Sequence, residues 1–323
     1  MNARILTTAT LFTTFAGVLA ATPADSQLLT MVMPDAKVIA GANVDSAKKS
    51  PFGMYLLTQL QSNDTELQEL IKMTGFDPTR DVDEVLVATS TAGVRATGLV
   101  LARGTFDPAL ATLAATKGAV TEVYNGVTII ETPDKEAGIA FISTSRVAAG
   151  DVPSVKAAID RSGSTSSLPQ NVLTQVNQWS TNEDGWVVTT VPLASMLPAG
   201  AAAGASGGNP MGNPMAGVMQ TVQQIAGGVK FGNSVVGTLA IQSDNAADAT
   251  QIANTLQFFV NLMQMQSQKN PEMANVAQAF NIGTKDAIVN ITITLPETQF
   301  QQFFQMEKRA TGGAEPMVRG GRK

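Results

Sequence analysis

The sequence predicts an α+β protein made of two related α/β units, each a mainly antiparallel sheet covered by helices on one face. The chain has 323 residues, of which 44% are hydrophobic, and this is enough to form two cores. Strand-like segments occur in pairs separated by short turn signals, which favours antiparallel pairing. The order of strand-like and helix-like segments recurs in the second half, which indicates an internal duplication. We therefore expect a first unit at residues 28–163, a linker with a short helix at 164–184, and a second unit at 185–309.

Turn and capping signals define the elements of the first unit. Asn125 and Gly126 lie between two β-prone runs, which is a strong signal for a tight hairpin turn. Ser50, Asp107 and Asp151 each precede a first helical turn that contains proline, so each is expected to cap a helix. The expected strands are 36–44, 83–90 and 96–104, the expected hairpins are 121–132 and 138–151, and the expected helices are 50–61, 65–76, 106–118 and 152–163.

The second unit is predicted to follow a polar boundary. Residues 164–184 are rich in serine and threonine around one short helical segment at 169–179, which is typical of a linker. The Asn-Pro pair at 213–214 matches the Ser-Pro pair at 50–51, so we expect a helix to begin there and residues 199–212 to form a flexible Gly/Met-rich insertion before it. The expected strands are 186–193, 233–244 and 286–296, and the expected helices are 213–228, 246–266, 270–280 and 297–309.

The N-terminus has the pattern of a secretory signal peptide. Arg4 supplies the positive start, residues 5–21 are apolar, and small residues follow. We expect residues 1–24 to be the signal peptide, with cleavage between Ala20 and Ala24, and the protein to be secreted or periplasmic. The alternative is an uncleaved N-terminal anchor that holds a surface protein to the membrane, although several threonines make this segment a poor span. The Gly-rich tail at 310–323 is expected to be disordered.

The composition excludes several classes of activity. The chain contains no cysteine and no histidine, which rules out disulfides, thiolate nucleophiles, metal sites built on these residues, and Ser-His-Asp catalysis. The formal net charge of −5 becomes −6 once residues 1–24 are removed, because Arg4 is the only charged side chain among them. We therefore expect no nucleic-acid partner, since phosphate binding needs clustered lysine and arginine. Because the sequence has no glycine-rich phosphate-binding motif, we expect no cofactor.

One pattern suggests a serine hydrolase. Ser46 and Lys49 form the S-x-x-K motif of serine β-lactamases and penicillin-binding proteins, and residues 243–245 form the S-D-N motif of the same enzymes. The third motif, K-T-G, is missing, because residues 116–118 have the order Thr-Lys-Gly. The separation of the first two motifs is also far too long for a β-lactamase. A hydrolase that uses a Ser46/Lys49 pair is therefore kept only as an alternative, and residues 243–245 are expected to lie at a helix start.

Two other clusters could bind metal but favour simpler roles. Four carboxylates lie close together between residues 77 and 84, and neighbouring carboxylates can hold calcium. These four lack the spacing of a calcium-binding loop, and Arg80 lies among them. Three methionines four residues apart could bind a soft metal, but no cysteine or histidine assists them and such methionines usually fill a core. We therefore assign no catalytic, cofactor-binding or metal-binding residues. The carboxylates are Asp77, Asp81, Asp83 and Glu84, and the methionines are Met211, Met215 and Met219.

Four segments of the first half carry a resemblance to known sequences. They read MPDAKVIAGANVDSAKKSPFG, FDPTRDVDEVLVA, LVLARGTFD and VAAGDVPSVKAAIDR. Together they resemble a group of uncharacterised secreted proteins from Acidobacteria-like soil bacteria, over residues 33–161. The segments describe strands and helix starts, so the resemblance implies a secreted protein and carries no activity and no functional residues.

The leading hypothesis is a secreted or periplasmic non-catalytic protein that binds a ligand or contributes to the structure of the cell envelope. It follows from the signal peptide, the absence of histidine and cysteine, and the lack of a complete catalytic motif. A small molecule, a peptide or an envelope component is the expected partner. The cleft between the two halves is the expected place for it, because ligands often bind between domains.

Overall fold

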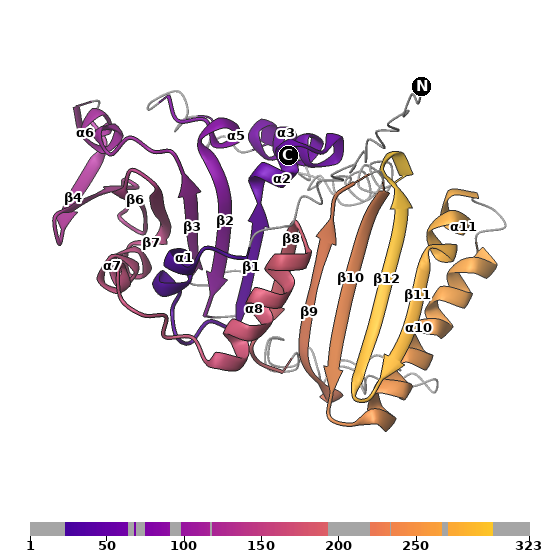
Figure 1. The fold of residues 1–323 in the computed structure, drawn as a ribbon. Helices are drawn as coiled ribbons and strands as arrows, with labels where there is room; N and C mark the ends of the chain where they lie inside the picture. The colour runs from indigo at the N-terminus through magenta and orange to yellow at the C-terminus, as the bar shows by residue number, and fades with distance from the viewer. Residues whose placement is uncertain are drawn as a thin grey trace, which may run out of the picture.

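The strands in the described part of the chain form one twelve-stranded antiparallel sheet with helices on both faces (Figure 1). The structure is a computed structural model, and the predicted α+β class is confirmed. The order of the strands across the sheet is β11-β12-β10-β9-β8-β1-β2-β3-β7-β6-β5-β4. The structure describes residues 23–63, 68, 75–90, 98–116, 118–192, 220–232, 234–266 and 271–299.

The bounds of the elements follow the chain. The strands are β1 (Val38–Asn43), β2 (Val82–Thr89), β3 (Gly98–Gly104), β4 (Val120–Tyr124), β5 (Val127–Glu131), β6 (Ala137–Ser143), β7 (Arg146–Asp151), β8 (Gly185–Thr189), β9 (Val222–Lys230), β10 (Ser234–Ser243), β11 (Phe280–Lys285) and β12 (Ile288–Pro296). The helices are α1 (Ser26–Met31), α2 (Val44–Lys48), α3 (Pro51–Asn63), α5 (Pro78–Asp81), α6 (Ala109–Thr116), α7 (Val152–Arg161), α8 (Gln170–Asn182), α10 (Ala246–Gln266) and α11 (Pro271–Gln278).

Local signals in the first half are confirmed. Asn125 and Gly126 both have positive φ, at 48° and 81°, and they make the tight turn between β4 and β5. The three predicted capping residues each accept a hydrogen bond from a backbone N–H of the first helical turn. Ser50 accepts from Gly53 at 3.2 Å, Asp107 from Ala109 at 2.9 Å, and Asp151 from Ser154 at 2.9 Å.

The two halves share one sheet, which corrects the expectation of one sheet in each unit. β8 pairs with β1 on one side and with β9 on the other, so the hydrogen-bonded ladder continues from one half to the next. An exposed edge strand leaves its backbone groups unpaired, and this pairing removes such an edge from each half. At the junction Trp186 packs on Gly41, where an added Cβ would lie 2.5 Å from the indole ring.

Helices cover both faces of the sheet, not one. Direct partners across the strands share a face, so Leu86, Val188 and Ala226 lie on the face that packs against α1, α7 and α8. We call this the α8 face. Leu239 and Ile291 lie on the opposite face, which packs against α10 and which we call the α10 face. Both faces carry apolar side chains because strands such as β2 alternate two sets of hydrophobic residues.

The linker expected at residues 164–184 contributes to the core of the molecule. Its helix, α8, buries Val172 and Val176 in the largest hydrophobic cluster, together with Val188 and Ala226 of the sheet. The helix is longer than expected and ends at Asn182, directly before β8. The segment therefore covers the sheet at the junction of the two halves.

The helix expected at 213–228 is wrong over its C-terminal part, because residues 222–230 form β9. In this segment Val222, Ile225 and Val229 fit a helical stripe almost as well as a strand, so the sequence pattern was ambiguous. Pairing with the neighbouring strands decides the outcome, and the glycines permit it because they allow close approach. A Cβ on Gly227 would lie 2.7 Å from the carbonyl oxygen of Thr238 in the neighbouring strand.

Several expectations fall outside the described residues. These are most of the signal peptide, most of the helix at 65–76, the insertion at 199–212, most of the helix at 297–309, and the tail at 310–323. Met211, Met215 and Met219 are also outside them. In the part of the chain that the structure describes, no helix combines the length and the hydropathy that crossing a membrane requires.

Candidate binding site

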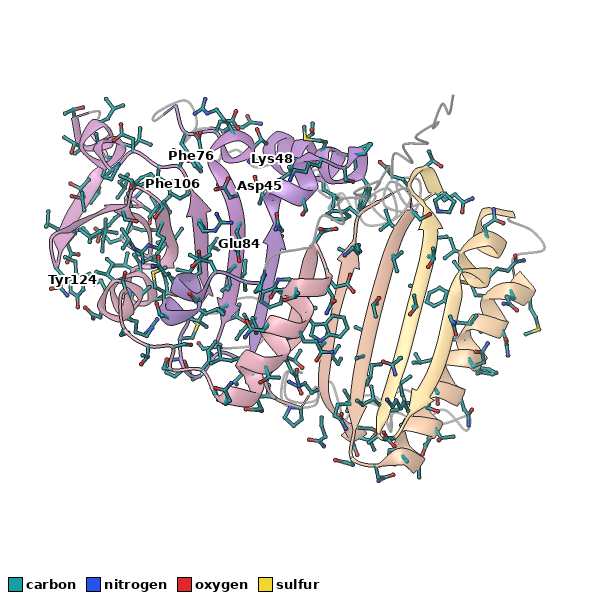
Figure 2. The ribbon with its side chains drawn as sticks, in the orientation of Figure 1. Asp45, Lys48, Phe76, Glu84, Phe106 and Tyr124 are labelled. Atoms are coloured by element: carbon teal, nitrogen blue, oxygen red, sulfur yellow. The ribbon has the colours of Figure 1, made fainter. Side chains whose placement is uncertain are left out.

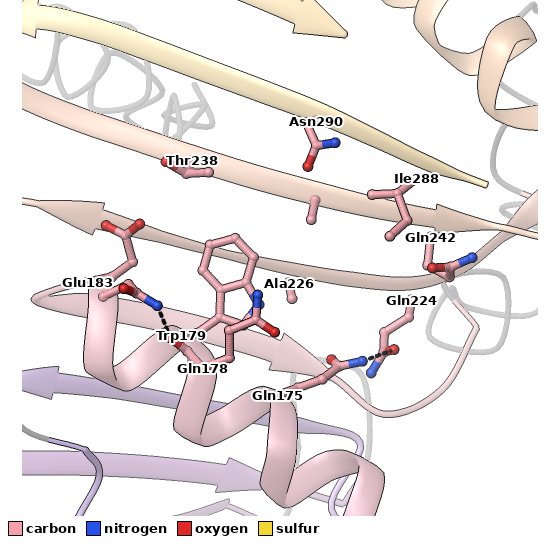
Figure 3. Close-up of a pocket in the computed structure, with 12 residues that line it drawn as sticks. Gln175, Gln178, Trp179, Glu183, Gln224, Ala226, Thr238, Gln242, Ile288 and Asn290 are labelled. Atoms are coloured by element: carbon pink, nitrogen blue, oxygen red, sulfur yellow. Dashed lines mark hydrogen bonds between the residues drawn. The ribbon is translucent and has the colours of Figure 1, made fainter. Parts of the chain in front are cut away.

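A polar pocket lies on the α8 face of the second half, between α8 and strands β9, β10 and β12 (Figure 3). Its volume is about 400 Å³. α8 and the residue after it form one wall, and the strands form the floor. The lining residues are Gln175, Gln178, Trp179, Asn182, Glu183, Gln224, Ala226, Thr238, Ala240, Gln242, Ile288 and Asn290.

The wall of the pocket is the polar stripe of an amphipathic helix. Val172, Val176 and Ser180 of α8 are four residues apart and buried, so they fix the helix on the core. The neighbouring stripe has the spacing i, i+3, i+4 and i+7, which places its side chains on one face of the helix. Figure 3 shows Trp179, Gln178 and Gln175 projecting from α8 towards the strands. The four residues of this stripe are Gln175, Gln178, Trp179 and Asn182.

The floor of the pocket is made of small side chains with amides beside them. Ala226 of β9 is paired with Ala240 of β10, which is in turn paired with Asn290 of β12. The neighbouring row places Gln224 opposite Gln242. Because alanine extends only one carbon from the sheet, the space above the central row stays open beneath Trp179.

Hydrogen bonds hold two amides of the pocket in a defined orientation. The amide nitrogen of Gln175 donates to Oε1 of Gln224 at 2.7 Å, and the amide nitrogen of Gln224 donates to the carbonyl oxygen of Thr189 at 2.6 Å (Figure 3). Oε1 of Gln175 is buried and has no hydrogen-bond partner among the described residues. The two hydrogen bonds thus fix both side chains, and Oε1 of Gln175 is left covered by its surroundings.

Glu183 supplies a second acceptor without a donor. Its side chain is 9% exposed, and no donor in the described part of the chain reaches Oε2. Burial raises the pKa of this carboxyl group, the charge of Asp184 adds to the effect, and Lys230 opposes it. Asp184 is equally buried, but its Oδ2 accepts a hydrogen bond from the backbone N–H of Phe231 at 2.7 Å. Glu183 is therefore a costly residue for the fold, because a buried polar group normally finds a partner.

Gly228 makes room for this carboxylate. A Cβ at position 228 would lie 2.5 Å from Cγ of Glu183, so the side chain of Glu183 passes over the glycine. The backbone N–H of Glu183 donates to the carbonyl oxygen of Trp179 at 2.9 Å, which fixes the residue at the end of α8. Its position relative to the pocket is thus set by backbone contacts.

A second cavity lies on the α10 face, with a volume of about 510 Å³. Its lining is apolar and includes Val187, Leu239, Phe280 and Ile293. Ligand sites in proteins usually combine apolar contacts with a few placed polar groups. The polar pocket meets this description better, and we take it as the candidate site.

The structure does not bring the two hydrolase motifs together. Ser46 lies in α2, which follows β1, and its backbone N–H donates to Oδ1 of Asn43, the residue that caps the helix, at 2.9 Å. β1, β8, β9 and β10 are successive antiparallel neighbours, so Ser243, at the end of β10, lies at the opposite end of the sheet. Ser243 donates to the carbonyl oxygens of Ala287 and Asn245, which is a structural role.

The lysines near Ser46 also have other roles. Lys49 is exposed. Lys48 forms an ion pair with Asp45 at 3.5 Å and donates to the carbonyl oxygen of Val82 at 2.7 Å (Figure 2). The second bond ties α2 to the start of β2, so this lysine holds the fold together.

The carboxylates singled out for calcium form ion pairs and hydrogen bonds. Asp81 pairs with Arg80 at 2.6 Å, and this contact lowers the pKa of Asp81. Glu84 and Asp83 each lie 3.3 Å from the guanidinium of Arg103. Burial nevertheless raises the pKa of Glu84, which is labelled in Figure 2. Among the described residues, no group of three or more acidic side chains could hold a metal ion.

Sequence reasoning missed the residues of the polar pocket. The helix that carries Gln175 and Trp179 was predicted, but as part of a linker. The available signal was the polar and aromatic stripe beside the apolar stripe of the same helix. Whether this stripe lines a pocket depends on the strands that lie opposite it, and the lining residues of these strands lie between positions 224 and 290.

Comparison with known proteins gives a likeness of fold only. No family model and no curated protein matches the chain. Crystal form III of TP0453 has a TM-score of 0.53 and 11% sequence identity, with 86% of this chain and 97% of that chain covered. Crystal form I of TP0453 has a TM-score of 0.51 and 10% identity, with 88% and 98% covered. The class is therefore an α+β fold similar to that of TP0453.

Proposed function

We propose that this protein is a secreted or periplasmic, non-catalytic binding protein of the cell envelope, and that its ligand lies in the polar pocket under α8. One observation carries the proposal. The pocket is lined by the carboxylate of Glu183 and by six side-chain amides, with no lysine or arginine among its lining residues. A ligand that carries several hydrogen-bond donors would satisfy these groups together.

The make-up of the pocket supports binding over catalysis. Glu183 is the only ionisable side chain among the residues that line it. General acid–base chemistry on carboxylates usually needs two groups with different roles. The alternative with Ser46 and Lys49 receives no support, because the other motif of those enzymes lies at the far end of the sheet.

We also propose that the two halves arose by duplication. The strand order β1-β2-β3-β7-β6 of the first half matches the order β8-β9-β10-β12-β11 of the second. In both halves a helix on the α8 face precedes the first strand, and these helices are α1 and α8. The correspondence between α1 and α8 supports assigning α8 to the second unit, where we had expected a linker.

Export with removal of a signal peptide is part of the proposal. Ala24 is 7% exposed, and its N–H donates to the hydroxyl of Ser180 at 2.9 Å. Cleavage after Ala24 would remove these contacts, and cleavage after Pro23 would place a charged amino terminus in a buried position. Both arguments favour cleavage upstream, after Ala20 or Ala21.

Titration calorimetry of the mature protein tests the binding function. Three groups of probes are used, namely the neutral disaccharides maltose, cellobiose, lactose and chitobiose, the dipeptides Ala-Ala and Ala-Gln, and choline. Saturable binding of any probe that is weakened in Glu183→Gln and unchanged in Glu131→Gln supports the function. Glu131 is a matched control, because it is also a buried carboxylate with an unpaired Oε2 but lies in β5, outside the pocket. No binding of any probe, or equal binding to both variants, would overturn it.

A further inference from the structure

We infer that the ligand of the polar pocket is a neutral saccharide of one or two rings, which stacks on Trp179 and exchanges hydrogen bonds with the Glu183 carboxylate and the side-chain amides that line the pocket. This inference rests on the proposed binding function and names the class of ligand. The argument has three steps, which concern charge, hydrogen bonding and shape.

The charge of the pocket disfavours anionic ligands. Glu183 is buried, and no lysine or arginine is among the residues that line the pocket. Lys230 is not a lining residue, and its amino group is bound to the backbone carbonyl oxygen of Asn182 at 3.0 Å. Phosphates, carboxylates and nucleotides would thus meet a carboxylate without a cation among the lining residues. A neutral ligand avoids this cost.

The polar groups of the pocket match hydroxyl groups. Hydroxyls donate and accept, so they can bind both the carboxylate of Glu183 and side-chain amides. Gln178, Gln242 and Asn290 bring three amides to the same pocket. The Gln175–Gln224 hydrogen bond fixes two further side chains of the lining before any ligand arrives. A molecule with hydroxyls in several directions fits this ring of amides.

Trp179 gives the pocket an apolar surface of the right kind. It is half-buried, packs against the core cluster on one side, and lines the pocket above Ala226 (Figure 3). A sugar ring has hydroxyls at its edge and a C–H face, so it can contact an aromatic face while its edge forms hydrogen bonds. A peptide or an amine would form fewer of these contacts, because neither combines a flat apolar face for Trp179 with several hydroxyl groups for the polar lining.

The volume of the pocket agrees with a small saccharide. A space of 400 Å³ equals the volume of about 13 water molecules at ~30 Å³ each. A hexose has about a dozen non-hydrogen atoms, and because these are covalently bonded it occupies less space than a dozen separate water molecules. The pocket therefore has room for one ring and for part of a second, which can extend past the exposed side chains of Gln178 and Asn290.

The calorimetric panel distinguishes this inference from the function on which it rests. We expect a neutral disaccharide to bind, with about tenfold lower affinity in Trp179→Ala and in Glu183→Gln, partial recovery in Trp179→Phe, and no change in Glu131→Gln. Binding of dipeptides or choline without any saccharide would overturn the saccharide assignment and leave the binding function standing. Absence of any binding would overturn both. Saccharide binding that survives in both pocket variants would overturn the assignment of the site, and far-ultraviolet circular dichroism checks that each variant folds.

Discussion

Replacing Glu183 by glutamine should make the protein more stable and weaken its binding of ligand. Glu183 is 9% exposed, and among the described residues its Oε2 has no hydrogen-bond donor. A buried acceptor without a partner costs about 1–3 kcal/mol, and a charged one lies at the upper end. Glutamine keeps the shape and removes the buried charge and its repulsion with Asp184. We expect the free energy of unfolding at pH 7 to rise by about 1 kcal/mol, which corresponds to about 2–4 °C in the melting temperature.

The pH dependence of the effect follows from the pKa of Glu183. This pKa is raised above its ordinary value of 4.5, so the folded protein holds the proton more tightly than the unfolded chain. The stabilising contribution of the proton on Glu183 is fully present below pH 4.5 and is lost as the pH rises through the raised pKa. The difference between Glu183→Gln and the wild type should therefore be small at low pH and grow towards pH 7. Thermal unfolding by circular dichroism at a series of pH values measures it.

Asp184→Asn is the control for this experiment. Asp184 is equally buried but accepts the N–H of Phe231 at 2.7 Å, so its replacement should lower the stability by about 1 kcal/mol. A destabilised Glu183→Gln protein at pH 7, or a gain that does not change with pH, would refute the reasoning. Either result would mean that Glu183 contributes to the fold, and its value as evidence for a ligand would be lost.

Three further predictions test the fold around the site. Gly41→Ala should lower the free energy of unfolding by about 1–3 kcal/mol, because the new Cβ would meet the ring of Trp186 at 2.5 Å, and urea unfolding measures the loss. Ser180→Ala should cost about 1 kcal/mol in the same assay, because it removes the acceptor for the N–H of Ala24, and an unchanged midpoint would contradict this role. The mature protein should retain Ala24, which intact mass spectrometry of the exported protein will show, and a chain that begins at Asp25 would count against the N-terminal contacts described above.

The parts of the fold that were predicted correctly depend on short-range chemistry. The turn at Asn125 and Gly126 and the cap at Asp151 follow from conformational preferences of a few neighbouring residues. The antiparallel pair β2–β3 follows from two β-prone runs near each other in the chain. None of these requires knowledge of distant segments.

The features that were missed depend on contacts between distant segments. Whether residues 222–230 form a strand is decided by their partners in β8 and β10, because glycines 227 and 228 suit close strand pairing as well as a helix end. The two halves share one sheet because β8 pairs with β1. This pairing could not be predicted from local sequence, because β1 lies more than a hundred residues earlier in the chain. The binding pocket also depends on distant segments. Its wall comes from α8 and its floor from three strands that follow α8 in the chain, one of which was predicted as a helix.

Nuclear magnetic resonance of the two tryptophan indoles tests the central claim most directly. The chain has two tryptophans, and Trp179 lines the polar pocket whereas Trp186 packs on Gly41 within the buried core of the α8 face. The Trp179→Phe variant assigns the two indole N–H signals. The account predicts that a neutral disaccharide shifts the Trp179 signal in a saturable way and leaves the Trp186 signal in place. Saccharides that shift neither signal, or a shift confined to Trp186, would contradict it.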